Sequence, residues 1–467
     1  MNILFSHGHE PDKCYFFSSV SEFLKEKNHS IIHMSFSSQE KFIYNSLDKE
    51  SNEIIDMTKQ LKKYSAILSK NDINKYDIDN LLEFTYKINE INKLDFSKKK
   101  LKDNAVRYIN FLNDYTKNNE IDKIIAWNET YMFDSILKDF SEKNNFEFIL
   151  FEAGLFRPNT ITIDSKGINY NNSINRNKQF YININIDNPN FLNELTSIKE
   201  KELYKYQKKK EFKKKHFIKE KIKDFLDSRL LNKRLDLSLL ANNEMILQKV
   251  FRRIDNFFIL FKNKFINKYK HKDNFEMKIE NYIFVPFQVN DDSQIISHSP
   301  NIKNMFELVE LVIKAGKKIN KTINDCTYKL VFKEHPKDTK TNYSHLYRNY
   351  NDHENVLFLQ SGDTKELINN SSMVITINST VGLEALMNFK KVITLGDAFY
   401  NIEGIVNHVE NPKNLAKEII NVKNKTLDKE LVKKFIYFLR YEYQMEGNWK
   451  EGSFNKKHLM NFINEDI

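Results

Sequence analysis

The fold class follows from one short stretch, residues 374–396, which reads VITINSTVGLEALMNFKKVITLG. Apolar β-branched residues run to Ile377, three polar residues follow, and apolar residues then return at the spacing of a helix. The segment KKVITLG after that helix is typical of a second buried strand. Two consecutive strands joined through a helix pair in parallel, so the stretch indicates an α/β sheet covered by helices.

The polar triplet Asn378, Ser379 and Thr380 falls at the predicted N-terminus of that helix. Ser, Thr and Asn are preferred N-cap residues, so ordinary capping is one explanation of the triplet. The other explanation is an anion site, because free backbone N–H groups and the positive end of the helix dipole favour a negative ligand. The hydroxyls of Ser379 and Thr380 would add donors to such a site.

The same alternation of strands and helices extends through most of the chain. It covers residues 1–195 and returns over 276–420, and these units predict two facing Rossmann-like domains with a cleft between them. Residues 196–275 form a basic stretch with a helical pattern, and 421–467 are predicted as helices that pack back across the domains. The predicted fold class is therefore α/β, with a helical insert and a C-terminal helical segment.

Composition and cysteine usage indicate a protein of the cytoplasm. The chain has 467 residues, 40% of them hydrophobic and 29% charged, and it contains no apolar run near the roughly 20 residues that a membrane span requires. The N-terminus MNILFSHGHEPDK begins as a strand and has no signal-peptide pattern. Cys14 and Cys326 lie too far apart in the sequence for a metal-spaced pair, so neither a zinc site nor a disulfide framework is indicated.

The net charge of +10 comes from 73 basic and 63 acidic residues, and much of the excess lies in residues 199–223 and 251–272. In the second segment phenylalanines interleave with Lys and Arg, as in a helix that lies on an anionic membrane surface. A solvated basic helix with its aromatic side in the core is an equal alternative. The chain shows no recognised nucleic-acid-binding module beside this charge, so we expect no nucleic-acid partner.

Polar residues follow three predicted strands of the second domain, where ligands bind in parallel sheets. INST follows one strand, and the segment YKLVFKEHPKD places Lys333, His335 and Pro336 after another. A basic residue and an imidazole at a strand end suit a phosphate or a ribose, although a single His is more often structural. The segment VPFQVNDDSQIISHSP supplies further hydrogen-bonding groups after a third strand: Gln288, Asn290, Asp291, Asp292, Ser293, Gln294 and His298.

The first domain has one comparable segment, residues 148–174, which reads FILFEAGLFRPNTITIDSKGINYNNSI. Glu152 ends a predicted strand, and Arg157 follows within a short turn. A carboxylate and an arginine so placed suit acid/base or nucleophilic work beside an acidic sugar. A structural salt bridge between the two side chains would explain the pair equally well.

Together these motifs resemble the capsular polysaccharide biosynthesis family of KpsS- and KpsC-type β-Kdo transferases. The resemblance rests on FEAGLFRPNTITIDSKGINYNNS, QVNDDSQIISHSP, FKEHPKD and ITINSTVGLEALMNFKKVITLGDAFYNIEGI, in this order, over roughly residues 120–410. It implies a GT-B fold and retaining transfer of Kdo from CMP-Kdo to a phosphatidylglycerol-based lipid, in capsular polysaccharide biosynthesis and export. The partners so implied are the nucleotide sugar, the lipid, the cytoplasmic face of the inner membrane and other capsule assembly and export proteins.

Site roles follow from the resemblance. It implies that the His335–Pro336 pair and the Ser379–Thr380 pair hold the CMP moiety. We expect no cofactor and no metal, because no carboxylate cluster with the character of a metal site accompanies these residues. The full set comprises Glu152 and Arg157 as catalytic residues; Gln288, Asn290, Asp292, Ser293, Gln294, His298, Lys333, His335, Pro336, Asn378, Ser379 and Thr380 for the donor; and His7, Gly8, Asn159 and Thr160 for the acceptor.

The sequence departs from the family pattern at one position. Related enzymes often have two adjacent carboxylates before the glycine, whereas this chain has Glu152, Ala153 and Gly154. Glu152 carries the catalytic role in our prediction, and the alternatives are a carboxylate from elsewhere, with Asp292 and Glu129 as candidates, or an inactive chain. Other open functions are transfer from CMP-sialic acid or a CDP-glycerol-type donor, and a noncatalytic binding role in capsule assembly.

Overall fold

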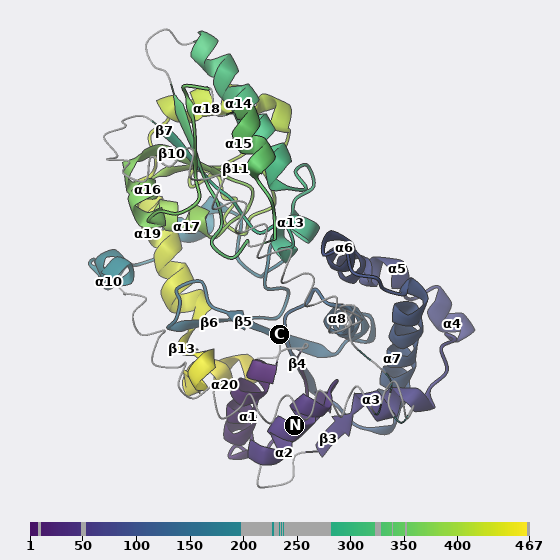
Figure 1. The fold of residues 1–467 in the computed structure, drawn as a ribbon. Coiled ribbons are helices and arrows are strands. Elements are labelled where there is room, and N and C mark those ends of the chain that lie inside the picture. The colour runs from purple at the N-terminus through teal and green to yellow at the C-terminus, as the bar shows by residue number, and fades with distance from the viewer. Residues whose placement is uncertain are drawn as a thin grey trace.

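The protein folds into two α/β units that lie one above the other in the computed structural model (Figure 1). The structure describes residues 1–7, 11–47, 53–197, 282–322, 328–338, 340–350 and 353–464, together with Asp227, Lys233, Leu235 and Leu237. The predicted basic insert therefore lies almost entirely outside the described residues. The α/β class and the two facing sheets covered by helices are confirmed.

The N-terminal unit is built on a sheet with the strand order β14-β13-β6-β5-β4-β1-β2-β3. Strands β1 to β5 pair in parallel, and β6, β13 and β14 extend the sheet in antiparallel fashion. The bounds are β1 (Asn2–His7), β2 (Ser30–Ser35), β3 (Glu53–Asp56), β4 (Lys123–Trp127), β5 (Glu147–Ala153), β6 (Thr160–Asp164), β13 (Gln444–Asn448) and β14 (Ser453–Phe454).

Helices cover both faces of this sheet, because successive strand residues are apolar on both sides. Leu4 and Leu150 belong to a core with α7 and α8, whereas Phe5 and Phe151 belong to a core with α1 and α20. The helices are α1 (Pro11–Lys25), α2 (Ser38–Leu47), α3 (Met57–Gln60), η1 (Leu61–Lys63), α4 (Lys70–Ile73), α5 (Ile78–Leu81), α6 (Glu83–Ile91), α7 (Lys98–Asn118), α8 (Met132–Asn144), α9 (Lys178–Ile182) and α10 (Phe191–Ser197).

The C-terminal unit has an all-parallel sheet in the order β12-β11-β10-β7-β8-β9. Its strands are β7 (Tyr282–Pro286), β8 (Lys329–Lys333), β9 (Val356–Leu359), β10 (Ser371–Thr376), β11 (Lys391–Thr394) and β12 (Asn407–His408). Its helices are α13 (Ser293–His298), α14 (Met305–Thr322), α15 (Ser344–Tyr350), α16 (Thr364–Asn370), α17 (Val381–Met387), η4 (Pro412–Asn414) and α18 (Leu415–Asn424).

In both sheets the strand order reverses at the first strand of the unit. In the N-terminal unit β1 lies between β2 and β4, and in the C-terminal unit β7 lies between β8 and β10. The chain adds strands on one side of the first strand and then crosses to the other side. The two topological switch points, β1/β4 and β7/β10, are therefore equivalent, and ligands bind at the carboxyl ends of strands at such points.

The C-terminal tail connects the two units. Helix α19 (Lys429–Phe438) packs against the C-terminal unit, and a π-helical turn, η5 (Leu439–Tyr443), leads to β13 (Figure 1). After β14, helix α20 (Lys456–Asn464) packs on α1. The prediction that this tail is helical is right for α19, α20 and the short 3-10 helix η6 (Trp449–Glu451), but wrong for the strands β13 and β14. The strands arise because β13 pairs with β6, which is 282 residues earlier at the Gln444–Thr162 pair, and local sequence carries no sign of that pairing.

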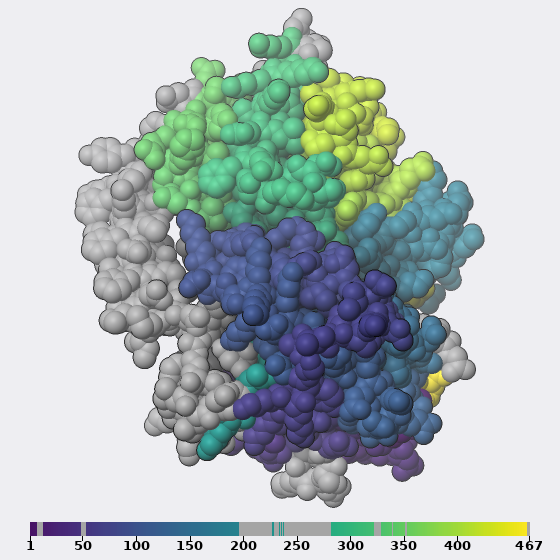
Figure 2. Space-filling model, turned by 90° about the vertical axis from the view of Figure 1, so that its right-hand side faces the viewer, coloured from purple at the N-terminus to yellow at the C-terminus, as the bar shows by residue number. Residues whose placement is uncertain are grey.

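The two units also touch directly on the side opposite the tail. Phe84 and Ile88 of α6 pack against Ile296 of α13. Lys340 Nζ donates to Asn92 Oδ1 at 2.6 Å and forms an ion pair with Asp291 at 2.7 Å. In Figure 2 the blue surface of the N-terminal unit meets the green surface of the C-terminal unit along this contact. No helix among the described residues is long and apolar enough to cross a membrane.

Candidate functional site

Two amide side chains occupy the switch point of the C-terminal sheet. Gln288 follows β7, Asn378 follows β10, and both side chains are buried. Gln288 Nε2 donates to Asn378 Oδ1 at 2.9 Å, and Gln288 Oε1 accepts from Asn378 N at 3.2 Å. Asn378 Nδ2 donates to the carbonyls of Gln294 and His298 at 2.8 and 2.9 Å. These two predicted donor-binding residues use their polar atoms to hold the surrounding loops in place.

The loop after β7 is likewise held by its own polar side chains. Asn290 Oδ1 accepts from Met305 N at the start of α14 at 3.0 Å. Asp292 Oδ1 accepts from Gln294 N at 2.9 Å and caps α13. Gln294 Nε2 reaches the N-terminal unit and donates to Asn169 Oδ1. The loop therefore connects the carboxyl edge of the C-terminal sheet to the other unit.

Lys333 ends β8 and is buried as a residue, with 7% of its surface exposed. Among the described residues its one hydrogen-bond partner is the carbonyl of Glu334, at a long 3.5 Å. Burial lowers the pKa of Lys333, and the nearby carboxylates of Asp363 and Glu384 oppose that shift. A buried cation with a single long hydrogen bond is suited to bind an anion.

His335 lies two residues further along, half-buried at the same edge. Its Nδ1 accepts a hydrogen bond from Lys337 N at 3.2 Å, so the proton of the neutral ring lies on Nε2. Burial lowers the pKa of His335, as do the charges of Lys337 and Lys333, whereas Asp292 raises it. The ring is therefore neutral at pH 7 and presents an Nε2–H donor. Pro336 follows it and is exposed.

Ser379 and Thr380 precede α17, as the sequence predicted. Ser379 Oγ accepts from Val381 N at 3.2 Å, and Tyr400 OH donates to the Ser379 carbonyl. Ser379 thus satisfies the first N–H of α17, whereas Thr380 is the N-cap residue and makes no side-chain cap hydrogen bond. Thr380 is exposed. The charge of Glu384, one turn into α17, raises the pKa of Lys333.

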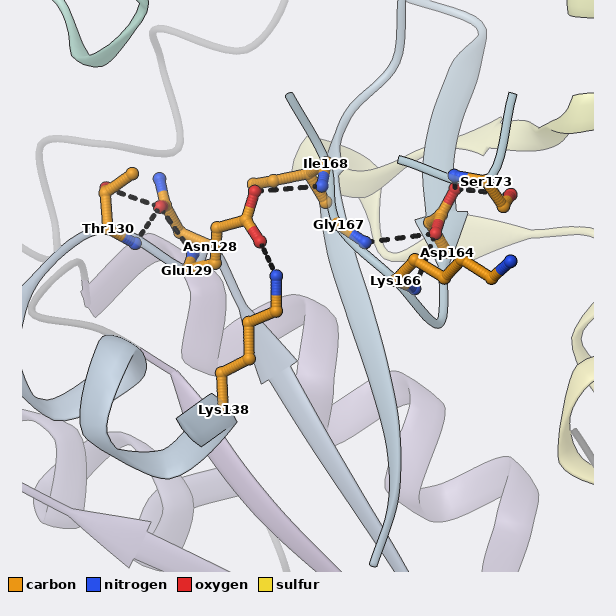
Figure 3. Close-up of polar contacts among 9 residues, drawn as sticks. All are labelled: Asn128, Glu129, Thr130, Lys138, Asp164, Lys166, Gly167, Ile168 and Ser173. Atoms are coloured by element: carbon orange, nitrogen blue, oxygen red, sulfur yellow. Dashed lines mark hydrogen bonds and ion pairs between the residues drawn. The ribbon is translucent and has the colours of Figure 1, made fainter. Parts of the chain in front are cut away.

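On the N-terminal side, the residues after β4 form a tight polar network (Figure 3). Asn128 Oδ1 accepts from Glu129 N at 2.6 Å and from Thr130 N at 2.9 Å. Glu129 Oε2 pairs with Lys138 Nζ at 2.5 Å, and Glu129 Oε1 accepts from Ile168 N at 3.1 Å. The Glu129 carboxylate is thus held rigidly by groups from α8 and from the loop after β6.

That loop is itself organised by Asp164, which the sequence analysis did not single out. Asp164 Oδ1 accepts from the backbone N–H groups of Lys166 and Gly167, at 2.7 and 3.1 Å (Figure 3). Asp164 Oδ2 accepts from Ser173 N at 2.8 Å and from Tyr443 OH at 2.9 Å. The tail residue Tyr443 thereby fixes the same loop that holds Glu129.

His298 lies where the two units meet. Its backbone carbonyl accepts from Asp397 N at 2.9 Å, and its ring lies 6.4 Å from that of Tyr170, measured between centroids. The ring is nearly buried, and burial lowers its pKa, while Glu129 of the N-terminal unit and Asp397 raise it. The ring makes no hydrogen bond within the described part of the chain. The charge of the Glu129 carboxylate thus acts on the His298 imidazole across the boundary between the units.

Glu152 and Arg157 do not form the salt bridge that the sequence left open. Glu152 Oε2 accepts from Asn128 Nδ2 at 3.4 Å, and Glu152 Oε1 accepts from Ala153 N at 2.8 Å. Arg157 is exposed, and its Nε donates to the carbonyl of Gly154 at 3.2 Å. Asn128 connects Glu152 to the Glu129 network, whereas the guanidinium of Arg157 is not paired with a carboxylate among the described residues.

The predicted acceptor residues divide between structural and open positions. Thr160 is buried, and its hydroxyl accepts from Phe156 N at 3.0 Å, so it closes the turn before β6. Asn159 is half-buried, and its carbonyl accepts from Gly447 N at 3.0 Å. His7 ends β1, and Gly8 lies outside the described residues. Ser293, predicted for the donor, is half-buried at the start of α13.

Glu334 is a further titratable residue at this edge, and the sequence analysis assigned it no role. Burial, followed by the charge of Asp338, raises the pKa of Glu334 to about 7. It lies between Lys333 and His335 in the sequence, so a signal was available in the motif KEHP. The described residues contain no group of three His, Cys, Asp or Glu side chains that could hold a metal ion.

Comparisons with known proteins agree on one family. A family model described as capsule polysaccharide biosynthesis protein matches residues 122–449. The chain is 22% identical to the capsule polysaccharide export protein KpsS of Escherichia coli over 317 residues, which cover 63% of this chain and 72% of KpsS. It is 23% identical to the capsule polysaccharide modification protein LipB of Neisseria meningitidis serogroup B over 376 residues, 76% of this chain and 81% of LipB.

Another relative and one solved structure are also similar. Protein FixF of Sinorhizobium fredii is 35% identical over 170 residues, 36% of this chain and 40% of FixF, so the match spans well under two thirds of that relative. The β-Kdo 2,7 transferase KpsC of Thermosulfurimonas dismutans superposes with a TM-score of 0.35 at 16% identity, covering 79% of this chain and 97% of that one.

Proposed function

The chain belongs to the capsule polysaccharide biosynthesis protein family, and from this membership and its site we propose that it is a glycosyltransferase. In this proposal it moves Kdo from CMP-Kdo to a phosphatidylglycerol-based lipid. The C-terminal unit holds the nucleotide, and the N-terminal unit presents the reacting carboxylate and the acceptor.

One observation carries the donor assignment, the undercompensated ammonium of Lys333. It lies nearly buried at the carboxyl edge of an all-parallel sheet, with a single carbonyl 3.5 Å away. The Nε2–H donor of His335 and the start of α17 with Ser379 and Thr380 lie at the same edge. This combination supports an anionic nucleotide, and a monophosphate donor such as CMP-Kdo carries little charge to neutralise. We therefore propose transfer without a metal cofactor.

In this proposal Glu152 is the nucleophile. Its carboxylate attacks the anomeric carbon of Kdo while the bond to the CMP phosphate breaks and CMP departs with the electron pair. The acceptor hydroxyl then displaces the carboxylate, so the configuration is retained. The neutral imidazole of His298 takes the hydroxyl proton, and Glu129 stabilises the imidazolium that forms. Arg157, exposed at the same turn, attracts the sugar carboxylate.

We further propose that the protein works at the cytoplasmic face of the inner membrane, beside other capsule assembly and export proteins. The basic segments 199–223 and 251–272 would contribute about 1 kcal/mol per exposed Lys or Arg near an anionic surface. A soluble acceptor should then need these segments less than a lipid acceptor in vesicles does.

The test is incubation of the purified protein with CMP-Kdo, generated in situ, and a short-chain fluorescent phosphatidylglycerol, followed by mass spectrometry of the lipid. We expect the mass of one Kdo to be added, in EDTA as well as without it. Glu152→Gln should abolish the product, and Glu142→Gln, the same change at an exposed position of α8, should not. An unmodified lipid would contradict the acceptor, and parallel reactions with CMP-sialic acid and CDP-glycerol would reveal another donor.

A noncatalytic binding role is the second candidate, and Ala153 beside Glu152 is the observation that favours it. A noncatalytic protein would bind CMP but transfer no group from any donor. It would also tolerate Glu152→Gln without a change in function.

A further inference from the structure

The C-terminal tail passes from one unit to the other at Tyr443. Helix α19 packs against the C-terminal unit, and from Gln444 onward the chain is a strand of the N-terminal sheet. Tyr443 is the last residue of the turn η5 between them, and 7% of it is exposed. Its ring stacks on that of Phe438 in α19, with 6.2 Å between the centroids. The next residue fixes the backbone against β6, because Gln444 Nε2 donates to Thr162 Oγ1 at 2.8 Å.

The hydroxyl of Tyr443 donates to Asp164 Oδ2 at 2.9 Å, and Asp164 is 1% exposed at the end of β6. The same oxygen accepts from the backbone N and the hydroxyl of Ser173, at 2.8 and 2.7 Å. The other oxygen accepts from Lys166 N and Gly167 N. A buried carboxylate is unfavourable unless it is hydrogen-bonded, so residues 165–173 are folded around this one side chain.

This loop lies directly against the Glu129 carboxylate (Figure 3). Ile168 N donates to Glu129 Oε1 at 3.1 Å, and Lys138 of α8 pairs with Oε2. A Cβ atom on Gly167 would lie 3.2 Å from Glu129 Oε2 and 2.9 Å from the carbonyl oxygen of Asn171, so the packing beside the carboxylate is tight. The Glu129 side chain is 8% exposed. A shift of the loop therefore moves the carboxylate.

The same loop also contacts helix α13 of the C-terminal unit. Asn169 Oδ1 accepts from Gln294 Nε2, and the ring of Tyr170 lies 6.4 Å from that of His298 between centroids. Burial lowers the pKa of His298, whereas the charges of Glu129 and Asp397 raise it and that of Lys138 lowers it. The protonation of His298 therefore reports on the position of the Glu129 charge.

We propose that Tyr443 is a positioning residue for Glu129. Its hydroxyl holds the Asp164 carboxylate, and Asp164 holds the N–H of Gly167, whose backbone leads into the N–H that binds Glu129. The tail that connects the two units thereby also determines where this carboxylate lies. The role of Glu129 in the reaction rests on the proposed transferase function, whereas its coupling to Tyr443 does not.

The experiment follows the titration of His298 by NMR in histidine-labelled full-length protein, so that it needs no turnover. The Cε1–H signal is assigned by its loss in His298→Gln. The variants are Tyr443→Phe, Glu129→Gln and the double variant. Tyr437→Phe is the matched control, because this half-buried tyrosine of α19 makes ring contacts but no hydroxyl hydrogen bond among the described residues. Hydrogen exchange of residues 165–173 and CMP affinity are recorded for each variant.

We expect Glu129→Gln to lower the pKa of His298, because it removes a negative charge. Tyr443→Phe should lower that pKa by a smaller amount and speed amide exchange at Gly167 and Ile168. In the Glu129→Gln background it should add no further change, because it acts through that carboxylate. Tyr437→Phe should alter neither quantity.

Turnover with CMP-Kdo gives a second readout. Tyr443→Phe should lower kcat about three- to tenfold, the effect of one neutral hydrogen bond, with the CMP dissociation constant unchanged. If Tyr443→Phe shifts the His298 titration through Glu129 but the wild type gives no product, the positioning role stands and the proposed transferase function fails.

An unchanged His298 titration in Tyr443→Phe would overturn the proposal. An equal shift in the Glu129→Gln background would overturn it as well, because Tyr443 would then act on His298 by another route. Should Tyr443→Phe not fold, Gly167→Ala decides the outcome, since its added methyl group enters the space beside Glu129 Oε2. Gly167→Ala should change the His298 titration only while Glu129 is present, and no change would overturn the proposal.

Discussion

The two switch points of this protein have the same strand order but differ in the hydrogen bonding of their buried polar side chains. At β7/β10, Gln288 and Asn378 satisfy each other and the loops around them, with bonds of 2.8 to 3.2 Å. At β1/β4, Ser6 and Asp134 are equally buried and make no such bonds among the described residues. The same topology is therefore compatible with a closely hydrogen-bonded switch point in one unit and a sparsely hydrogen-bonded one in the other.

From this difference we infer that the two units have different functions. The satisfied amide pair fixes the loops that carry Lys333, His335 and Ser379 around the nucleotide, so its own atoms need not touch the ligand. The N-terminal unit contains the Glu152 and Glu129 network, to which the proposed function assigns the chemistry. Changes in the C-terminal unit should alter nucleotide affinity or stability, and changes in the N-terminal unit should alter turnover or acceptor affinity.

The largest expected effect is that of Glu152→Gln on turnover. Removing the nucleophilic carboxylate should lower kcat by about three orders of magnitude or more, with the CMP dissociation constant unchanged. Single-turnover kinetics and CMP titration check the two parts separately. Near-normal turnover would remove Glu152 from the mechanism and make Glu129 the next carboxylate to test.

A smaller effect is expected on nucleotide affinity from Lys333→Gln. Loss of a charge-assisted hydrogen bond at a buried position should weaken CMP binding about 20- to 100-fold. Lys337→Gln, an exposed neighbour in the same loop, is the control and should change the affinity less than about threefold. If both variants bind CMP equally well, Lys333 does not contact the phosphate.

Stability provides the direct contrast between the two switch points. Gln288→Leu leaves Asn378 N and Oδ1 without their partner, and should lower the free energy of unfolding by about 2 kcal/mol. Ser6→Ala removes a hydroxyl that has no partner, and should change that free energy by less than about 0.5 kcal/mol. Chemical denaturation measures the free energy of unfolding of both variants. Equal losses of stability would contradict the predicted difference between the two switch points.

The smallest predicted effect is a pH dependence from Glu334. Because its pKa is about 7, the carboxyl is mostly neutral at pH 6 and mostly ionised at pH 8. The added negative charge beside the nucleotide should weaken CMP-Kdo binding about threefold over this range. Glu334→Gln should remove that part of the dependence, and an identical pH profile in both proteins would place Glu334 away from the ligand.

Much of the fold could be predicted from the sequence, because β-branched runs alternate with amphipathic segments in both units. The same pattern placed Lys333, His335 and Ser379 at the carboxyl ends of strands. The added strands β6, β13 and β14 escaped prediction, since β13 pairs with a segment 282 residues away at the Gln444–Thr162 pair. Periodicity within a short window contains no information on that pairing.

Some features of the candidate site could not be predicted from the sequence. Gln288 and Asn378 were predicted to bind the donor, and only the structure shows that their mutual hydrogen bonds also hold the surrounding loops. Asp134 has the sequence signature of an ordinary acidic residue in the first turn of a helix. Its full burial depends on α2 and α7 packing over it, which only the structure shows.

The central claim is that the nucleotide and the acceptor occupy different units of the protein. Hydrogen–deuterium exchange with mass spectrometry tests it most directly, first with CMP and then with the acceptor lipid. We predict that CMP slows exchange in residues 333–338 and 379–384, and that the acceptor slows it in residues 152–160, which contain Glu152, Asn159 and Thr160. Protection of the N-terminal unit by CMP, with none at residues 333–338, would contradict the account.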